Sequence, residues 1–112
     1  MSNSAHPVIA LPTAVGGAYE LVKSPVRLTL VRWLTDYPNS LVSEIVVGIG
    51  GHRGPVAVHL AALEAIGAVQ TGHALGDRER RHVRYRVNAH RVKALLDTLA
   101  RFLTDPPVDT FS

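Results

Sequence analysis

A cluster of four glycines between residues 48 and 54 constrains the fold of this chain more than any other feature. Gly48, Gly50, Gly51 and Gly54 separate two short apolar segments, and Pro55 follows them directly. Glycine ends helices and builds tight turns, whereas proline is well tolerated at the start of a helix. The cluster therefore predicts two short helices that meet at a tight turn, which is a helix-turn-helix.

The two helices on either side of this turn have readable boundaries. Ser43 can cap a short helix that runs through Glu44–Val47. The second helix is expected at residues 55–66, where Gly67 fits a left-handed C-terminal cap. Its predicted core stripe consists of Val56, Leu60, Leu63 and Ile66. His59 lies on the flank of this stripe and is interpreted as a partly buried packing residue.

Further helices are predicted before and after this unit. Ser24 and Pro25 supply a cap and a first-turn proline for a mostly buried helix at residues 25–36, which Pro38 ends. The first 23 residues are read as an arm with a short helix near Ala18–Lys23. Asn88 can cap a last helix at about residues 89–104. The expected division is thus an arm at 1–23, one domain at 24–104 and a tail at 105–112.

From Ala68 onward the apolar period changes to two, which is typical of β-strands. Alternation runs from Val69 to Leu75 and resumes from His82 to Val87, on either side of a turn at residues 76–79. This pattern predicts a β-hairpin. Because strand side chains alternate between faces, one side of the hairpin would present a stripe of about 20 Å, at roughly 3.3 Å per residue. The stripe consists of Arg80, His82, Arg84 and Arg86.

The charge of the chain is concentrated in the same region. Residues 78–93 contain seven of the twelve Lys and Arg residues and one of the nine Asp and Glu residues, so they carry +6. The other residues carry −3, from five basic and eight acidic side chains. Ten of the twelve basic residues are arginine, which suits bidentate contacts with phosphate or guanine. An anion-binding hairpin is favoured over a solvated hairpin without a partner.

Size and composition exclude several classes of protein. A chain of 112 residues suits one domain, and the absence of cysteine excludes disulfides and thiolate sites. The longest apolar stretch, Val56–Val69, is broken by His59 and Glu64, so neither a membrane span nor membrane association is expected. Residues 1–23 lack the pattern of a secretory signal, which favours the cytoplasm. No catalytic motif is present, so an enzyme is not expected, and no cofactor is predicted.

The order of elements and certain residues resemble a known family. The residues are Glu44-Ile45, His59-Leu60, Leu63-Glu64 and Gly67-Ala68-Val69, whose spacing is similar to that of ArsR-like and, less closely, MarR-like bacterial repressors. The resemblance covers about residues 25–103. It implies an α+β, mainly α, winged helix-turn-helix with a two-stranded wing and terminal helices that form a dimer interface. The implied function is sequence-specific binding of double-stranded DNA by a homodimeric repressor.

The resemblance also assigns residues to these roles. The contacts of the turn and recognition helix would be His52, Arg53, Gly54, Pro55, Ala57 and Val58. The contacts of the wing would be Arg78, Arg80, Arg81, His82 and Arg84. The dimer interface would consist of Val92, Leu95, Leu96, Leu99, Phe102 and Leu103.

The chain departs from the family pattern at two places. Small and apolar residues replace the polar ones at the front of the recognition helix, so direct base readout should be sparse and salt dependence steep. The metal residues of the family are also missing, since cysteine is absent and His90 has no ligand at i+3 or i+4. His73 and His82 would form a two-ligand site at most. No metal is therefore predicted, and the sequence identifies no effector.

Two alternatives to a specific DNA-binding regulator stay open at this point. The first is a winged-helix module that binds another protein, which the apolar residues at 54–58 motivate. The second is an architectural protein that binds DNA without regard to sequence.

Overall fold

The computed structural model describes residues 10–72 and 83–106. Helices α1 (Thr13–Val22) and α2 (Pro25–Asp36) come first, followed by strand β1 (Ser40–Leu41) and helices α3 (Val42–Ile49) and α4 (Arg53–Ala65). Strands β2 (Val69–Gly72) and β3 (Arg84–Val87) and helix α5 (Ala89–Thr104) complete this order. The arrangement confirms the predicted winged helix-turn-helix of the mainly α type. Residues 73–82, which include the predicted turn of the hairpin, lie outside the described residues.

Three predicted helix ends are confirmed by their hydrogen bonds. The Ser24 hydroxyl accepts from the Arg27 N–H at 3.4 Å, and Pro25 occupies the first turn of α2. The Asn88 side chain accepts from the Arg91 N–H at 3.1 Å at the start of α5. After α4, Gly67 adopts a φ of 80°, and its N–H donates to the Glu64 carbonyl, so the left-handed conformation satisfies the helix end.

Other predicted helix starts were wrong. Helix α1 begins at Thr13, five residues before the predicted Ala18, because its apolar side chains pack against α5. Helix α3 begins at Val42 with Leu41 at the cap position, so Ser43 lies inside it and the Glu44 carboxylate accepts from the Leu41 N–H at 2.8 Å.

The start of α4 also differs from its prediction. The helix begins at Arg53, two residues before Pro55. Proline fits there because the N–H groups of a first helical turn have no partner within the helix. The two additional residues extend the helix toward the glycine turn.

The sheet has three strands where two were predicted. Its order is β1-β3-β2, and both pairings are antiparallel. In the hairpin, Gln70 pairs with Arg86 and Gly72 with Arg84, whereas Ser40 of β1 pairs with Tyr85. A strand of two residues shows no alternation in the sequence, which explains why β1 was missed.

The core lies between the helices and one face of the sheet. Its fully buried large side chains come from every helix and from β2, and they are Leu21, Leu30, Leu34, Ile45, Val56, Leu60, Leu63, Val69 and Leu95. Trp33 and Tyr85 are partly buried against this cluster, as predicted for core aromatics. Helix α2 was predicted to be mostly buried, which is wrong. It buries Arg27, Leu30 and Leu34, while Val26 and Leu28 are exposed.

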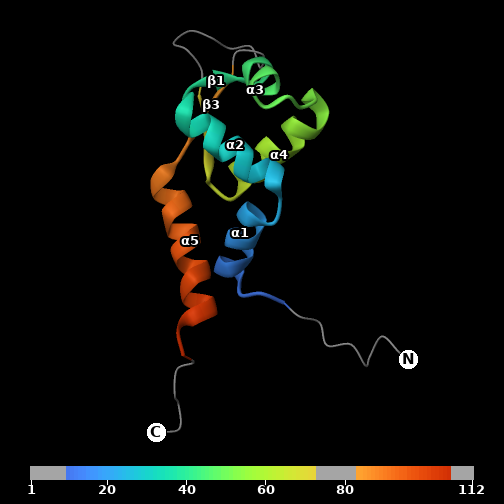
Figure 1. Cartoon of the computed structure of the whole chain (residues 1–112). Coiled ribbons are helices and arrows are strands. Elements are labelled where there is room, and N and C mark those ends of the chain that lie inside the picture. The colour runs from blue at the N-terminus through green and yellow to red at the C-terminus, as the bar shows by residue number, and fades with distance from the viewer. Residues whose placement is uncertain (1–9, 73–82, 107–112) are drawn as a thin grey trace, which may run out of the picture.

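The elements divide between two ends of the molecule (Figure 1). Helices α3 and α4 and the sheet lie at one end, and α1 and α5 lie side by side toward the other. Within the part of the chain that the structure describes, no helix is long and apolar enough to cross a membrane.

Candidate nucleic-acid interface

The turn between α3 and α4 depends on two glycines for different reasons. Gly50 has a φ of 73°, a left-handed conformation that side chains disfavour, and its N–H donates to the Val46 carbonyl at 3.0 Å. Gly51 also donates to the Val46 carbonyl, at 3.1 Å, and a Cβ there would lie 3.0 Å from Cγ2 of Val56. The turn therefore brings the start of α4 close to the end of α3, and larger residues would separate them.

Helix α4 has one buried and one exposed face. Val56, Leu60 and Leu63 point into the core. The six residues predicted from the resemblance to contact DNA are all exposed, namely His52, Arg53, Gly54, Pro55, Ala57 and Val58. Val58 keeps 65% of its surface exposed. The structure thus brings these residues together around the first half of one accessible helix.

The start of α4 has polar groups that remain available. His52 occupies the N-cap position with extended backbone, and its side chain makes no capping hydrogen bond. Early N–H groups of a helix have no carbonyl partner within it, so this end is suited to accept an anion such as a phosphate. Arg53 adds a long cationic side chain at the same end.

The described part of the wing presents arginines on one face. Arg84 and Arg86 are exposed, while Tyr85 and Val87 between and after them are partly buried, which confirms the predicted alternation. Nη1 of Arg84 donates to the Asn39 carbonyl at 3.2 Å, and Nε of Arg86 donates to the Gln70 side chain at 3.4 Å. The other predicted wing residues, Arg78, Arg80, Arg81 and His82, lie outside the described residues, as does His73.

A buried arginine that sequence reasoning missed connects three helices. Arg27 of α2 is 8% exposed. Its Nε donates to Nδ1 of His59 on α4 at 3.1 Å, and its Nη1 donates to the carbonyl and carboxylate oxygens of Glu20 on α1, at 2.7 and 2.8 Å. His59 is partly buried, as predicted, and it also links α4 to this network. No local pattern signals a network whose members are 7 and 32 residues apart.

The network affects one ionisable group clearly. Hydrogen bonds from Arg27 and then from Lys23 stabilise the charged form of the Glu20 carboxylate, and they hold its pKa below the usual 4.5. The Glu20 side chain keeps 40% of its surface exposed to solvent. The guanidinium of Arg27 is therefore paired with a carboxylate whose charged form it stabilises.

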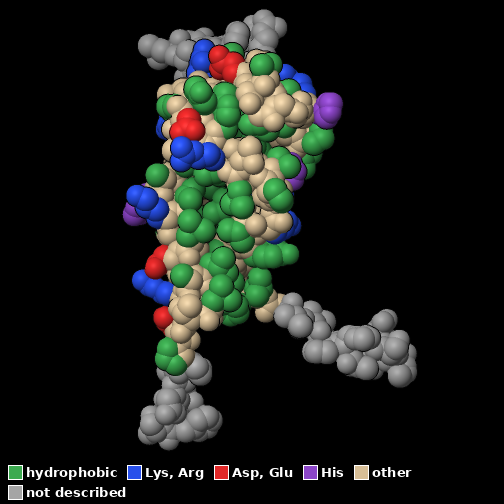
Figure 2. Space-filling view, in the orientation of Figure 1, with side chains coloured by type: hydrophobic (Ala, Val, Ile, Leu, Met, Phe, Trp, Pro, Cys, Tyr) green, Lys and Arg blue, Asp and Glu red, His purple; other side chains and the backbone are tan. Residues whose placement is uncertain are grey.

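The six residues predicted for a dimer interface fall into two groups. Leu95 is buried against the core, and Val92 and Leu99 are partly buried there. Leu96, Phe102 and Leu103 are exposed, the last two by 49% and 69%. Figure 2 shows apolar side chains gathered over α1 and α5. These helices present an exposed apolar face at the end of the molecule away from the wing.

Metal-ligating side chains do not gather in the described ranges, 10–72 and 83–106. No group of three or more His, Asp or Glu residues lies close enough there to hold a metal ion. His90 is exposed at the start of α5. The first carboxylate that follows it on this helix is Asp97, seven residues later.

Comparisons with known proteins place the fold. No protein-family model matches the sequence, and a search of curated proteins finds no match. Among solved structures, the crystal structure of an ArsR family transcriptional regulator aligns with a TM-score of 0.63 at 18% identity, over 86% of this chain and 93% of that one. The transcriptional repressor BigR from Xylella fastidiosa aligns with a TM-score of 0.57 at 24% identity, over 84% and 88% of the two chains.

A third structure comes from Mycobacterium bovis. It is the homodimeric winged helix-turn-helix DNA-binding domain of Mb0332, a possible ArsR-family transcriptional regulator, with a TM-score of 0.58 and 23% identity over 82% of this chain and 79% of that one. These likenesses establish the fold of the chain as the winged helix-turn-helix that ArsR-type regulators share.

Proposed function

We propose that this protein is a homodimeric regulator of transcription that binds double-stranded DNA sequence-specifically and acts as a repressor in the cytoplasm. The observation that carries the proposal is the exposed first half of α4, which follows a tight glycine turn. The same domain also presents Arg84 and Arg86 on the exposed face of β3. In the proposed complex, α4 enters the major groove and the wing contacts the backbone or the minor groove. The solved structures of similar fold support this assignment.

The two contact regions would contribute differently to binding. Arg53 and His52 are the strong hydrogen-bonding side chains at the front of α4, whereas Ala57 and Val58 offer only apolar contact, for example with thymine methyl groups. Phosphate contacts by wing arginines would then supply much of the affinity. Binding should accordingly weaken steeply as salt rises.

The dimer would form through the exposed apolar face of α1 and α5. Tyr19 of α1 and Leu96, Phe102 and Leu103 of α5 are exposed on these helices, which pack against each other within one chain. A two-fold dimer buries the same patch on both copies and places two recognition helices to read an inverted repeat. One structure of similar fold is described as homodimeric, which supports this arrangement.

Fluorescence anisotropy with a pool of genomic DNA fragments tests the proposal. We expect saturable binding at low salt. The double variant Arg84→Ala/Arg86→Ala should bind every fragment more weakly, and each lost phosphate contact should make the negative slope of log K against log salt shallower by about 0.9. Arg101→Ala is the matched control, because this exposed arginine pairs with Asp97 near the far end of α5. Absence of any saturable binding at low salt would overturn the proposal.

A second experiment separates base reading from charge. Selection of binding sites from random duplexes should yield an inverted repeat for the wild type and an altered sequence preference for Arg53→Ala. Arg101→Ala should select the same sites as the wild type. An unchanged preference in Arg53→Ala would refute its assignment to base contact.

One observation favours a different function as a second candidate. Val47 on α3 and Val58 on α4 are 83% and 65% exposed, so the helix-turn-helix carries apolar surface that a partner protein can cover. Purification of a stoichiometric protein complex, together with no DNA binding, would favour an interaction module. Similar affinity for unrelated duplexes would instead indicate an architectural DNA-binding protein.

A further inference from the structure

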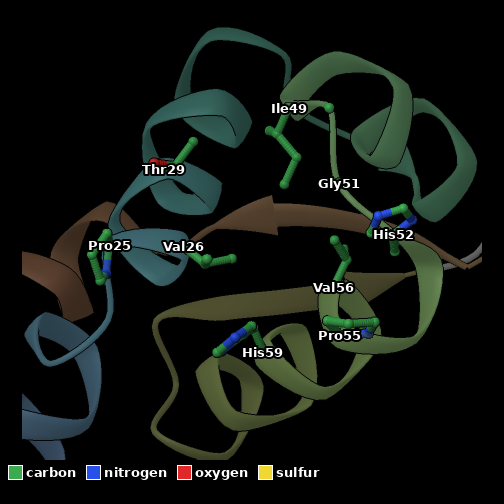
Figure 3. Close-up of a pocket in the computed structure, with 10 residues that line it drawn as sticks. Pro25, Val26, Thr29, Ile49, Gly51, His52, Pro55, Val56 and His59 are labelled. Atoms are coloured by element: carbon green, nitrogen blue, oxygen red, sulfur yellow. The ribbon is translucent and has the colours of Figure 1, made fainter.

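A pocket of about 370 Å³ lies between α2, the turn after α3 and the first half of α4. Figure 3 shows Val26, Ile49 and Val56 directed into this space from three sides, with Pro55 and His59 along α4. The walls are mainly apolar, and the volume is in the range of pockets that bind small molecules. The pocket is therefore large enough for a molecule with two fused rings.

His59 gives this pocket a defined hydrogen-bonding group. Its Nδ1 accepts from Nε of Arg27, so a neutral His59 carries its proton on Nε2. Among residues 10–72 and 83–106, no hydrogen-bond acceptor is paired with Nε2. The imidazole lines the pocket and is held in position by the buried arginine, so its second nitrogen is the polar group that we expect an occupant to meet.

The lining determines which chemistry an occupant needs. The residues around the pocket include two histidines and Thr29 but no Asp or Glu, so an acceptor meets no carboxylate there. We propose that the pocket binds a small, largely apolar molecule with one hydrogen-bond acceptor, a carbonyl or a carboxylate. The acceptor binds Nε2–H of His59, and the apolar body lies between Val26 and Val56.

Such a molecule would act on the surface that is proposed to contact DNA, and this step rests on the proposed function. His52 and Pro55 line the pocket and also belong to the exposed start of α4. A molecule in the pocket therefore competes with DNA for the same end of the helix. By linkage, the molecule lowers the affinity for DNA by the factor by which DNA lowers the affinity for the molecule.

Three naphthalene derivatives test the ligand chemistry without DNA. 2-Naphthoate and 2-acetylnaphthalene carry an acceptor, whereas 2-ethylnaphthalene has a similar apolar body and none. We expect the first two to bind with dissociation constants below 1 mM, from shifts of the Val26 and Val56 methyl signals in NMR titrations, and the third to bind about tenfold more weakly. Binding of the carboxylate alone would identify the acceptor as an anion. Equal affinity for all three, or no binding of any, would overturn the proposal.

Variants of the pocket provide the controls. His59→Phe should remove the preference for the two acceptor compounds, and Val26→Phe, which fills the pocket, should weaken both by at least tenfold. Leu28→Phe places the same ring on the exposed surface of α2 outside the pocket and should leave binding unchanged. Thermal unfolding verifies that each variant is folded. Unchanged binding in Val26→Phe would place the compounds elsewhere, for example on the apolar face of α1 and α5, and would refute the site.

The link to DNA is measured separately. Saturating 2-naphthoate should weaken the binding of DNA several-fold in the wild type and leave it unchanged in Val26→Phe. If the compound binds the pocket but the affinity for DNA stays the same, the proposed competition is wrong. If the protein binds no DNA at all, the proposed function fails, while the NMR titrations still decide whether the pocket binds the ligand.

Discussion

The contact between Trp33 of α2 and Gly48 of α3 makes a sharp prediction about how the helix-turn-helix is supported. A Cβ on Gly48 would overlap the indole ring of Trp33, whereas a Cβ on Gly16 of α1 would meet no atom within 4 Å. Both glycines lie inside helices, so alanine at either position gains up to about 1 kcal/mol of helix propensity. Only Gly48→Ala also has to displace a packed aromatic ring.

The structure sets the expected difference between these two variants. Overpacking a well-packed site costs about 1–3 kcal/mol. Because the propensity gain is nearly common to both variants, Gly48→Ala should be about 1–3 kcal/mol less stable than Gly16→Ala. At about 4–8 °C per kcal/mol for a domain of this size, the melting temperatures should differ by at least about 4 °C. The stability of Gly16→Ala should equal or exceed that of the wild type.

Urea and thermal unfolding, followed by circular dichroism at one protein concentration, measure these stabilities. Trp33 is the single tryptophan of the chain, and its ring lies 4.7 Å from that of Tyr37. Its fluorescence should therefore change in folded Gly48→Ala and not in Gly16→Ala. Equal stabilities together with unchanged fluorescence would refute the argument that glycine at 48 is required by the close approach of α2 and α3.

Three further predictions concern the ends and surfaces of the helices. Because the folded state depresses the pKa of Glu20, its carboxylate stabilises the fold above the unfolded value of 4.5, and this contribution is lost as pH falls through the folded pKa. Urea unfolding from pH 7 to pH 3 should therefore show a larger loss of stability for the wild type than for Glu20→Gln, and parallel profiles would contradict this. Asn88→Ala should destabilise the protein by about 1 kcal/mol in urea unfolding, because the cap of α5 is lost, whereas Asn88→Asp should retain most of the stability. Phe102→Glu should convert the proposed dimer to a monomer in light scattering, whereas Arg101→Glu, on the side of α5 away from Leu96 and Leu103, should not; a dimeric Phe102→Glu would exclude this face as the interface.

Local chemistry made much of the fold predictable. Ser24 and Asn88 cap the starts of α2 and α5 with side-chain hydrogen bonds, and Gly67 follows the end of α4 in a left-handed conformation, each as expected from residue type and position. The alternation along β3 likewise follows from its sequence. These features depend on residues within a few positions of one another, which is the range over which sequence patterns carry structural information.

Features that depend on distant residues were not predictable. Strand β1 exists because Ser40 and Leu41 pair with β3, more than forty positions later, and two residues show no period of their own. Burial of Arg27 depends on Glu20 and His59, which belong to two other helices. The exposed residues at the start of α4 could be grouped from the sequence because the turn and the first half of this helix are contiguous in the chain, whereas their contact with DNA stays a prediction. The pocket was missed because α2 supplies one of its walls.

The Arg27 network also bears on how the two ends of the molecule are related. Helix α1 packs on α5 at the proposed dimer face, and Arg27 ties the end of α1 to the middle of α4 through Glu20 and His59. In a two-fold dimer, the separation of the recognition helices is set by the orientation of α4 relative to the dimer face, and half-site spacing on DNA must match it. Polar contacts from a rigid guanidinium constrain direction more closely than apolar packing does. The Arg27 network is therefore suited to holding α4 at one angle relative to the proposed dimer face. A ligand bound to His59 would contact a member of the network that holds this angle.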